Sequence, residues 1–307
     1  MNEQTVVFGP EQHLVGTITQ PAQAKPGHAA VLVLLTNAGV IPRIGPHRLN
    51  VKLARHLASM GVASLRFDMS GLGDSRRSGS RRSTGEQFVA DTIAAMDLAK
   101  QQFDCAQFVM VGFCSGGDVA HLTALADARL RAIVMWDSYV YPNTKAKLFG
   151  FIHRARRHGL HSAFIKALRF VRAASKNRDA SAAAGQPVES PVIFGRTRMP
   201  PRDEFGNSIR TLVDRGVELH FVYSGGEPDW YNYERQFHDM FEPYGFVDQV
   251  AYTYLTQSDH TLTQPKAQDA FIACVDDWLE QRAWPALEKA RTSAAAQGVA
   301  PPALQAA

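Results

Sequence analysis

The sequence predicts an α/β protein: a doubly wound, mostly parallel sheet with helices on both faces and a helical cap inserted between two of its strands. Two observations lead to this fold class. Short β-rich apolar runs alternate with longer helical patterns, which is typical of repeated strand-helix units. The composition, with 45% hydrophobic and 20% charged residues among 307, is that of a globular chain and excludes a collagenous or disordered one.

The first half of the chain opens with a hairpin and then alternates strands with helices. Short β-rich runs at 6–8 and 14–19 predict two antiparallel strands. The unbroken aliphatic run at 30–35 predicts a buried strand, and the helix expected at 48–60 ends at a glycine before the strand at 63–67. This order of elements is the beginning of a series of strand-helix units.

The second half continues the series. Apolar residues at helical spacing, among them Phe88, Ile93 and Met96, predict a helix over 86–102. The remaining strands are expected at residues 108–111, 131–136, 219–223 and 250–255, and the remaining helices at 118–125, 232–240 and 266–281. These elements are enough for one open sheet.

A basic stretch interrupts the series. Residues 138–178 contain ten Lys or Arg and no Asp or Glu, although the whole chain carries only +4. Such a block marks either a separate structural insert or a surface for an anionic partner. We therefore expect an α/β core of residues 1–140 and 212–285, a basic helical cap of residues 141–211, and a flexible Ala/Gln/Pro-rich tail of residues 286–307.

The cap has two interpretations. Apolar residues such as Leu148, Phe149, Phe164 and Leu168 recur at helical spacing among its cations. The plainer interpretation is a cap that packs its apolar side over the site and leaves its charges in water. The sharper one is recruitment of an anionic or carrier-bound small-molecule substrate, or peripheral contact with an anionic membrane. Nucleic acid is not expected as a partner, because few stacking aromatic residues accompany the cations.

The N-terminus and the cysteines bear on compartment and cofactors. The longest aliphatic run is much shorter than a membrane span, and the first residues lack the pattern of a signal peptide, so we expect a cytoplasmic protein. Three cysteines, without a Cys-x-x-Cys or a His/Cys cluster, predict neither a structural disulfide nor a zinc site. We expect no cofactor and no metal.

The residues around position 114 have the pattern of a nucleophile elbow, in which a strand turns sharply into a helix and presents a reactive side chain. Such a turn needs small residues two positions before and two positions after that side chain. Gly112 and Gly116 bracket Cys114 in this way, whereas a pattern centred on Ser115 would place Phe113 at a small position. The spacing favours Cys114 over Ser115. The alternative to both is a glycine-rich turn with an inert, buried thiol.

His260 is the candidate base, because it follows the last expected strand and completes the nucleophile, acid, base order found in enzymes with such an elbow. A thiol at the start of a helix gains thiolate character from the helix dipole, and a neighbouring base completes its activation. A third group should orient the imidazole. Glu227 is the first choice for it and Asp229 the second, both after the seventh expected strand. Asp137, after the sixth, is a third possibility.

Hydrogen-bond donors for a developing oxyanion are expected at two places. One is the backbone amide of Ser115, the residue after the candidate nucleophile, and the other comes from Ala38 or Gly39 in the loop after the third expected strand. The glycine-containing loop at 68–75 lacks the ending of a P-loop and the acidic residue of a dinucleotide fingerprint. We interpret that loop as structural.

Together these motifs resemble the α/β-hydrolase superfamily over residues 6–278. The loop at 68–75, the elbow around Cys114 and the Asp-His-Thr sequence at His260 carry the likeness. More narrowly, the sequences at 37–39, 231–237 and 259–262 resemble serine aminopeptidase-like hydrolases, including those associated with exosortase systems.

Two residues depart from the usual pattern of the superfamily. Cys114 stands where most members have serine, as it does in dienelactone hydrolases, and Asn37 stands where many lipases have His-Gly. The resemblance implies hydrolysis of an ester, thioester or amide through a covalent acyl-enzyme.

The residues and the resemblance lead to one expected mechanism. The Cys114 thiolate attacks the carbonyl, His260 acts as base and then as acid, and Glu227 or Asp229 positions the imidazole. The alternatives are an acyltransferase, or a non-catalytic protein of the same fold that binds an anionic ligand or partner through its basic cap.

Overall fold

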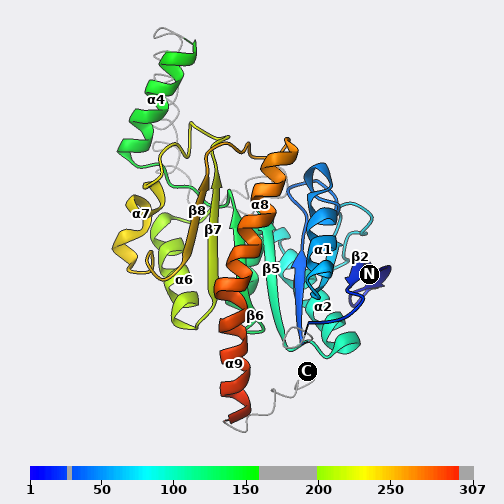
Figure 1. Ribbon diagram of the computed structural model, residues 1–307. Helices are drawn as coiled ribbons and strands as arrows, with labels where there is room; N and C mark the ends of the chain where they lie inside the picture. Colours follow the sequence, from blue (N-terminus) through cyan, green and yellow to red (C-terminus); the bar gives the residue numbers. More distant parts are fainter. Residues whose placement is uncertain (26–29, 159–198, 297–307) are drawn as a thin grey trace.

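The computed structural model of the chain describes residues 1–25, 30–158 and 199–296. Within these residues, eight strands form one sheet that lies between two layers of helices (Figure 1). The strands are β1 (Asn2–Phe8), β2 (Leu14–Gln20), β3 (Val31–Leu35), β4 (Ala63–Asp68), β5 (Gln107–Phe113), β6 (Leu130–Trp136), β7 (Glu218–Ser224) and β8 (Ala251–Leu255). The helices are α1 (Leu49–Ser59), α2 (Thr84–Phe103), α3 (Ser115–Ala126), α4 (Thr144–His158), α6 (Arg202–Asp214), α7 (Gln236–Phe241), α8 (Pro265–Trp278) and α9 (Trp284–Ala296).

The sheet has the strand order β1-β2-β4-β3-β5-β6-β7-β8. β2 runs antiparallel to β1 and to β4, and every pair from β4 through β8 is parallel. The expected mostly parallel, doubly wound sheet is therefore confirmed. Because β3 lies between β4 and β5, the strand order reverses there, and open α/β sheets place their ligand sites at the carboxyl ends of such strands.

Each face of the sheet buries its own apolar layer. Successive side chains of a strand point to opposite faces, so Phe108 and Met110 of β5 join the layer covered by α2, α3 and α6, whereas Val109 and Val111 join the layer covered by α1 and α8. Because helices cover both faces, the central strands are apolar on both sides. This explains the unbroken apolar runs in the sequence.

The inserted region departs from its expected boundaries. Within the expected cap, residues 141–211, the described helices are α4 and α6. α4 projects beyond the sheet, at the end where β7 and β8 finish (Figure 1). α6 instead packs on the core, since Phe205 is 1% exposed and its ring lies 4.7 Å from that of Tyr139. The expected boundary is corrected, because the core resumes with α6. The cap residues Phe164 and Leu168 lie outside the described residues.

The C-terminal helical region is longer than expected. α8 continues through a π-helical turn, Leu279–Ala283, into α9. The expectation of a flexible tail from residue 286 is therefore corrected up to the end of α9, where Leu287 is 3% exposed and packs in the layer next to α1 and α8. Within the described parts of the chain, every helix is too short or too polar to cross a bilayer.

Candidate active site

A strained backbone turn connects β5 to α3. Cys114 forms it with φ 54° and ψ −119°, a conformation that costs a non-glycine residue about 1–3 kcal/mol. Two backbone hydrogen bonds hold the turn, from the Cys114 N–H to the Trp136 carbonyl (2.9 Å) and from the Gly117 N–H to the Cys114 carbonyl (2.9 Å). The Cys114 side chain is partly exposed at the carboxyl end of β5. This is the strand-to-helix geometry expected of an elbow.

The two glycines that flank the turn are required for steric reasons. A Cβ at Gly112 would lie 2.4 Å from the carbonyl oxygen of Gly116. A Cβ at Gly116 would lie 2.8 Å from the carbonyl oxygen of Asn37, in the loop after β3. Backbone atoms do not tolerate such contacts, so the spacing around Cys114 has the physical basis inferred from the sequence.

His260 faces the elbow from the loop between β8 and α8. Its ring is hydrogen bonded to the Cys114 thiol and, through Nδ1, to Oδ2 of Asp137 at 2.9 Å. Trp136 fixes the loop by donating its Nε1–H to the His260 carbonyl (2.9 Å), and the ring of Phe113 lies 5.9 Å from the imidazole. The imidazole is 27% exposed, so a substrate can reach it.

Asp259, the residue before His260, anchors the same loop. Its carboxylate accepts hydrogen bonds from the Thr261 hydroxyl (2.8 Å), the Thr263 backbone N–H (2.9 Å) and the Thr263 hydroxyl (2.7 Å). Although partial burial acts in the opposite direction, these bonds lower the pKa of Asp259 to about 2. Asp259 is therefore a charged anchor that orients the loop.

Asp137, the residue after β6, holds the other side of the imidazole. It is 7% exposed, and its φ of 42° turns the chain where β6 ends. Oδ1 accepts the backbone N–H of Ser224 at 2.7 Å, and Oδ2 accepts the Ser224 hydroxyl at 2.6 Å besides His260. With three donors, the carboxylate is oriented independently of any substrate.

Glu227 and Asp229, the first and second choices for this position, lie elsewhere. Asp229 accepts a hydrogen bond from the guanidinium of Arg154 in α4 at 2.6 Å, and Glu227 is exposed. The carboxylate that the fold brings to His260 is Asp137, the third possibility. The expected order of the three is therefore corrected: the acid at the imidazole comes from the end of β6 instead of the loop after β7.

These neighbours set the charge of the imidazole. The hydrogen bond to Asp137, followed by that to Cys114, raises the pKa of His260 to about 10, against the opposing effect of burial. At neutral pH the ring is therefore an imidazolium between a carboxylate and a sulfur. A positive charge beside a cysteine favours its thiolate form.

The expected oxyanion donors gather at the first turn of α3. The loop after β3 lies against this turn, because the backbone N–H of Gly39 donates to the Ser115 hydroxyl at 2.8 Å. In the same loop, the Ile41 N–H closes a turn on the Ala38 carbonyl at 3.0 Å. The backbone amide of Ser115 belongs to the start of α3, where amides have no partner within the helix. The structure thus brings Ser115 and the Ala38–Gly39 loop together, with the Gly39 amide engaged by a side chain of the protein.

A buried carboxylate fixes the loop after β3. Asp68, fully buried at the end of β4, accepts the side-chain amide of Asn37 at 2.9 Å and the backbone N–H of Arg43 at 2.6 Å. Asn37 in turn accepts the Met69 N–H at 2.7 Å. A Cβ at Gly73 would meet the Asp68 carboxylate, which explains this glycine. The loop at 68–75 is therefore built around Asp68 and supports the site from outside it.

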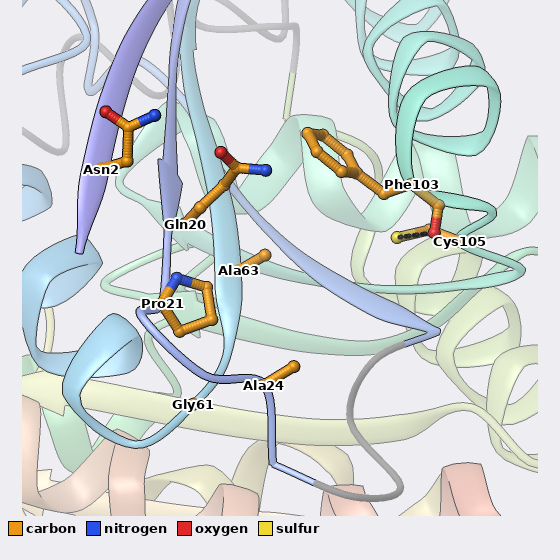
Figure 2. A pocket seen from close by; sticks show the side chains of 8 residues that line it. All are labelled: Asn2, Gln20, Pro21, Ala24, Gly61, Ala63, Phe103 and Cys105. Atoms are coloured by element: carbon orange, nitrogen blue, oxygen red, sulfur yellow. Dashed lines mark hydrogen bonds between the residues drawn. The ribbon is translucent and has the colours of Figure 1, made fainter.

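Cys105 offers a contrast to Cys114. Together with Asn2, Gln20 and Phe103 it lines a pocket next to the start of β4 and β5, at the opposite end of these strands from Cys114 (Figure 2). Cys105 is 1% exposed, and its burial raises the pKa of its thiol to about 11, which makes it unreactive. The described residues contain no group of three or more His, Cys, Asp or Glu side chains placed to hold a metal ion.

Known proteins share this architecture. Residues 43–178 match the family model described as the alpha/beta hydrolase fold. An esterase of Pyrococcus furiosus superposes with a TM-score of 0.57 at 14% identity over 91% of each chain. The esterase domain of a Rhodothermus marinus protein superposes with a TM-score of 0.54 at 15% identity over 91% of this chain and 98% of that one. This chain has the α/β-hydrolase fold.

A proline iminopeptidase of Mycobacterium smegmatis has the same α/β-hydrolase fold, with a TM-score of 0.53 at 17% identity over 94% of this chain and 100% of that one. A search of curated proteins finds no match to the sequence. In the α/β-hydrolase fold of this chain, Cys114 follows β5, Asp137 follows β6 and His260 follows β8. All three lie at the carboxyl ends of parallel strands.

Sequence reasoning missed Ser224, which fixes Asp137 through two hydrogen bonds. A signal for it exists. β6 and β7 are adjacent and parallel, so the residues that end them lie side by side. A carboxylate after one buried strand and a hydroxyl at the end of the next are then natural hydrogen-bond partners.

Proposed function

We propose that the protein is a hydrolase that cleaves an ester or thioester through a covalent acyl-Cys114 intermediate. The observation that carries the proposal is the chain of contacts from a buried carboxylate, Asp137, through the His260 imidazole to the thiol at the strained turn after β5. A structural thiol needs neither the strained turn nor the charged histidine.

Cys114 acts first in the proposed mechanism. Its thiolate attacks the carbonyl carbon of the substrate, a C–S bond forms, and the carbonyl electron pair moves to the oxygen. The raised pKa of His260 keeps its proton available. His260 then gives that proton to the leaving oxygen or sulfur as the bond between it and the acyl carbon breaks.

Release of the acyl group reverses these roles. The neutral His260 accepts a proton from water, the resulting hydroxide attacks the acyl-Cys114 carbonyl, and the C–S bond breaks to give a free acid. Asp137 takes no part in these proton transfers; its task is to orient the ring and stabilise its protonated form. An acceptor other than water would make the protein an acyltransferase, and the products distinguish the two.

Thioesters are favoured among the candidate substrates. Exchange between a substrate thioester and an acyl-cysteine is nearly balanced in energy, because one C–S bond replaces another. Among oxygen esters, those with a good leaving group suit the same attack. The similar solved structures include two esterases and a proline iminopeptidase, so an amide substrate is a distinct outcome to be tested.

The test is intact-mass detection of an acyl adduct after a brief incubation with a panel of esters, thioesters and peptide amides. We expect an adduct that peptide mapping localises to Cys114 and that Cys114→Ala abolishes. Cys105→Ala is the matched control, because it removes a buried thiol at the other end of the strands. An adduct on Ser115, or turnover that survives Cys114→Ala, would overturn the proposal.

We also propose that α4 recruits an anionic, carrier-bound acyl substrate. Among its cations, Arg154 pairs with Asp229, and Lys145 lies near Asp239. Lys147 and Arg156 are exposed and add positive charge next to them. The rival class, a non-catalytic protein that binds an anionic ligand here, predicts binding without any adduct on the thiol.

A further inference from the structure

The Ser115 hydroxyl is a buried polar group beside the proposed nucleophile, and the mechanism so far gives it no task. Ser115 is 5% exposed and is the first residue of α3. Its oxygen accepts the Gly39 N–H at 2.8 Å. A serine hydroxyl can accept and donate at once, and no acceptor for its hydrogen is found among the described residues.

A buried hydroxyl with an unused hydrogen requires a partner, because leaving a buried donor unsatisfied costs free energy. The place of Ser115 indicates which partner. The backbone amide of Ser115 is an expected donor to the oxyanion, because Ser115 follows the proposed nucleophile. The Ser115 side chain points from the same residue towards the loop after β3, where it meets Gly39. The negative charge of an acyl intermediate would develop between these two elements.

We propose that the Ser115 hydroxyl donates its hydrogen to the oxyanion of the acyl intermediate, as a side-chain member of the oxyanion hole. This role rests on the proposed function of Cys114. The Gly39 N–H does not contact the oxyanion directly; it polarises the hydroxyl that does, and bonds in such a series strengthen one another. The proton stays on Ser115 in every step.

The loop after β3 makes this arrangement stable. The Asn37 side chain ties the loop to Asp68 at 2.9 Å and to the Ile41 carbonyl at 2.9 Å. Gly39 therefore approaches Ser115 from a fixed position. A hydroxyl held in this way needs no reorganisation when charge appears, which is the property that makes oxyanion donors effective.

Three variants test the role of the hydroxyl. Ser115→Ala removes it without adding volume, whereas Ser115→Thr keeps it and Ser115→Val replaces the Thr hydroxyl by a methyl group of similar shape. We expect kcat to fall about 10- to 100-fold in the Ala and Val variants and to be largely retained in the Thr variant. All three should still form the acyl adduct on Cys114.

Two further readouts separate this role from a structural one. Alkylation of Cys114 by iodoacetamide creates no oxyanion, so its rate should be the same in the wild type and Ser115→Ala. Replacing the carbonyl oxygen of the substrate by sulfur weakens hydrogen bonds to it, so the ratio of oxo-ester to thiono-ester rates should be smaller in Ser115→Ala than in the wild type.

Two results would overturn the role of Ser115 alone. The first is an equal kcat for the wild type and Ser115→Ala. The second is a Ser115→Ala variant in which kcat and the alkylation rate of Cys114 fall together, while the ratio of oxo-ester to thiono-ester rates stays at the wild-type value. A wild-type protein that forms no acyl-Cys114 adduct would overturn the proposed function and this role with it. If the Thr and Val variants fail to fold, Ser115→Ala and its two readouts still decide the question.

Discussion

Single residues decide the charge of the site. Asp137 is 7% exposed, and its two oxygens take hydrogen bonds from Ser224 and from His260. A carboxylate so enclosed cannot be replaced by a neighbouring group, and Asp229 is tied to Arg154. Asp137 is therefore the group that has the largest effect on the pKa of the imidazole, ahead of Cys114.

Asp137→Asn should lower kcat/KM by about 10²–10⁴-fold, because the amide neither stabilises the imidazolium nor selects its tautomer. The pH profile should move as well. The pKa of His260 is raised to about 10, so the protonated form that serves the leaving group is lost only as the pH rises through about 10. We expect the alkaline limb of wild-type kcat/KM near that pH, and a limb at lower pH in the variant.

Asp229→Asn is the matched control, because it also removes a carboxylate near the site but one that pairs with Arg154. With a neutral ester, which the charges of α4 do not attract, its kcat and alkaline limb should equal those of the wild type. An unchanged profile in Asp137→Asn, or a shifted one in Asp229→Asn, would contradict the assignment of the acid.

At the scale of elements, close contacts between backbones position these residues. The turn after β5 contacts the loop after β3 through Gly116 and Asn37. The loop after β7 contacts the histidine loop at Gly226, where a Cβ would lie 2.6 Å from the backbone nitrogen of His260. Because glycine has no Cβ, the loops that follow these strands can pack closely against one another around the site.

Gly112→Ala should destabilise the protein by about 1–3 kcal/mol and abolish activity, because the new methyl group would lie 2.4 Å from the Gly116 carbonyl oxygen. Urea denaturation measures the first effect and the rate of acyl-adduct formation the second. Gly150→Ala in α4 is the control, since its Cβ would meet atoms no closer than 3.4 Å. Equal stability of the two variants would show that the turn tolerates rearrangement.

The sequence predicted the central strands β3, β5 and β6 well because they are buried on both faces and read as continuous apolar runs. β1 begins at Asn2 instead of residue 6, because its exposed first half carries no apolar run. It misjudged α6, since the basic stretch before it suggested a cap although Phe205 and Ile209 are buried in the core. It misjudged α9, because the alanine run that ends this helix belongs to an Ala/Gln/Pro-rich stretch that resembles a flexible tail.

The site was predictable as far as spacing along the chain determines it. Gly112, Cys114 and Gly116 lie within five residues, so local sterics identify the turn. The acid was harder, because β6 and β7 are adjacent and parallel and both are followed by carboxylates. The hydrogen bond from His260 to Asp137 distinguishes the two loops, and it joins residues 123 positions apart.

At the scale of the whole molecule, α4 is a basic element set apart from the core of the sheet. α4 carries its cations beyond the end of the sheet that bears Cys114, and α9 lies at the opposite end (Figure 1). Charges outside the site affect the binding of a charged substrate, and hence KM, but leave kcat unchanged. Salt screens such charges.

Replacing Lys147 and Arg156 together by Ser should raise KM for an anionic carrier thioester about two- to tenfold and leave kcat unchanged, because each exposed charge pair contributes about 0.2–1 kcal/mol. Steady-state kinetics at low and high salt measure the effect, and high salt should abolish it. Lys289→Ser in α9 is the control, and a neutral ester should be insensitive to all three changes. A salt-independent KM would contradict recruitment.

Because Asp137, the residue after β6, orients His260, the connection between β7 and α7 supplies no group to the proposed mechanism. Asp229 in that connection tethers α4 instead. Gly226 in this connection is fixed by its contact with the histidine loop, and Tyr231 is buried. The exposed Glu227 and Trp230 are therefore the positions that can change while the reacting atoms keep their places. For the same reason, these exposed positions are where new recognition residues can be introduced.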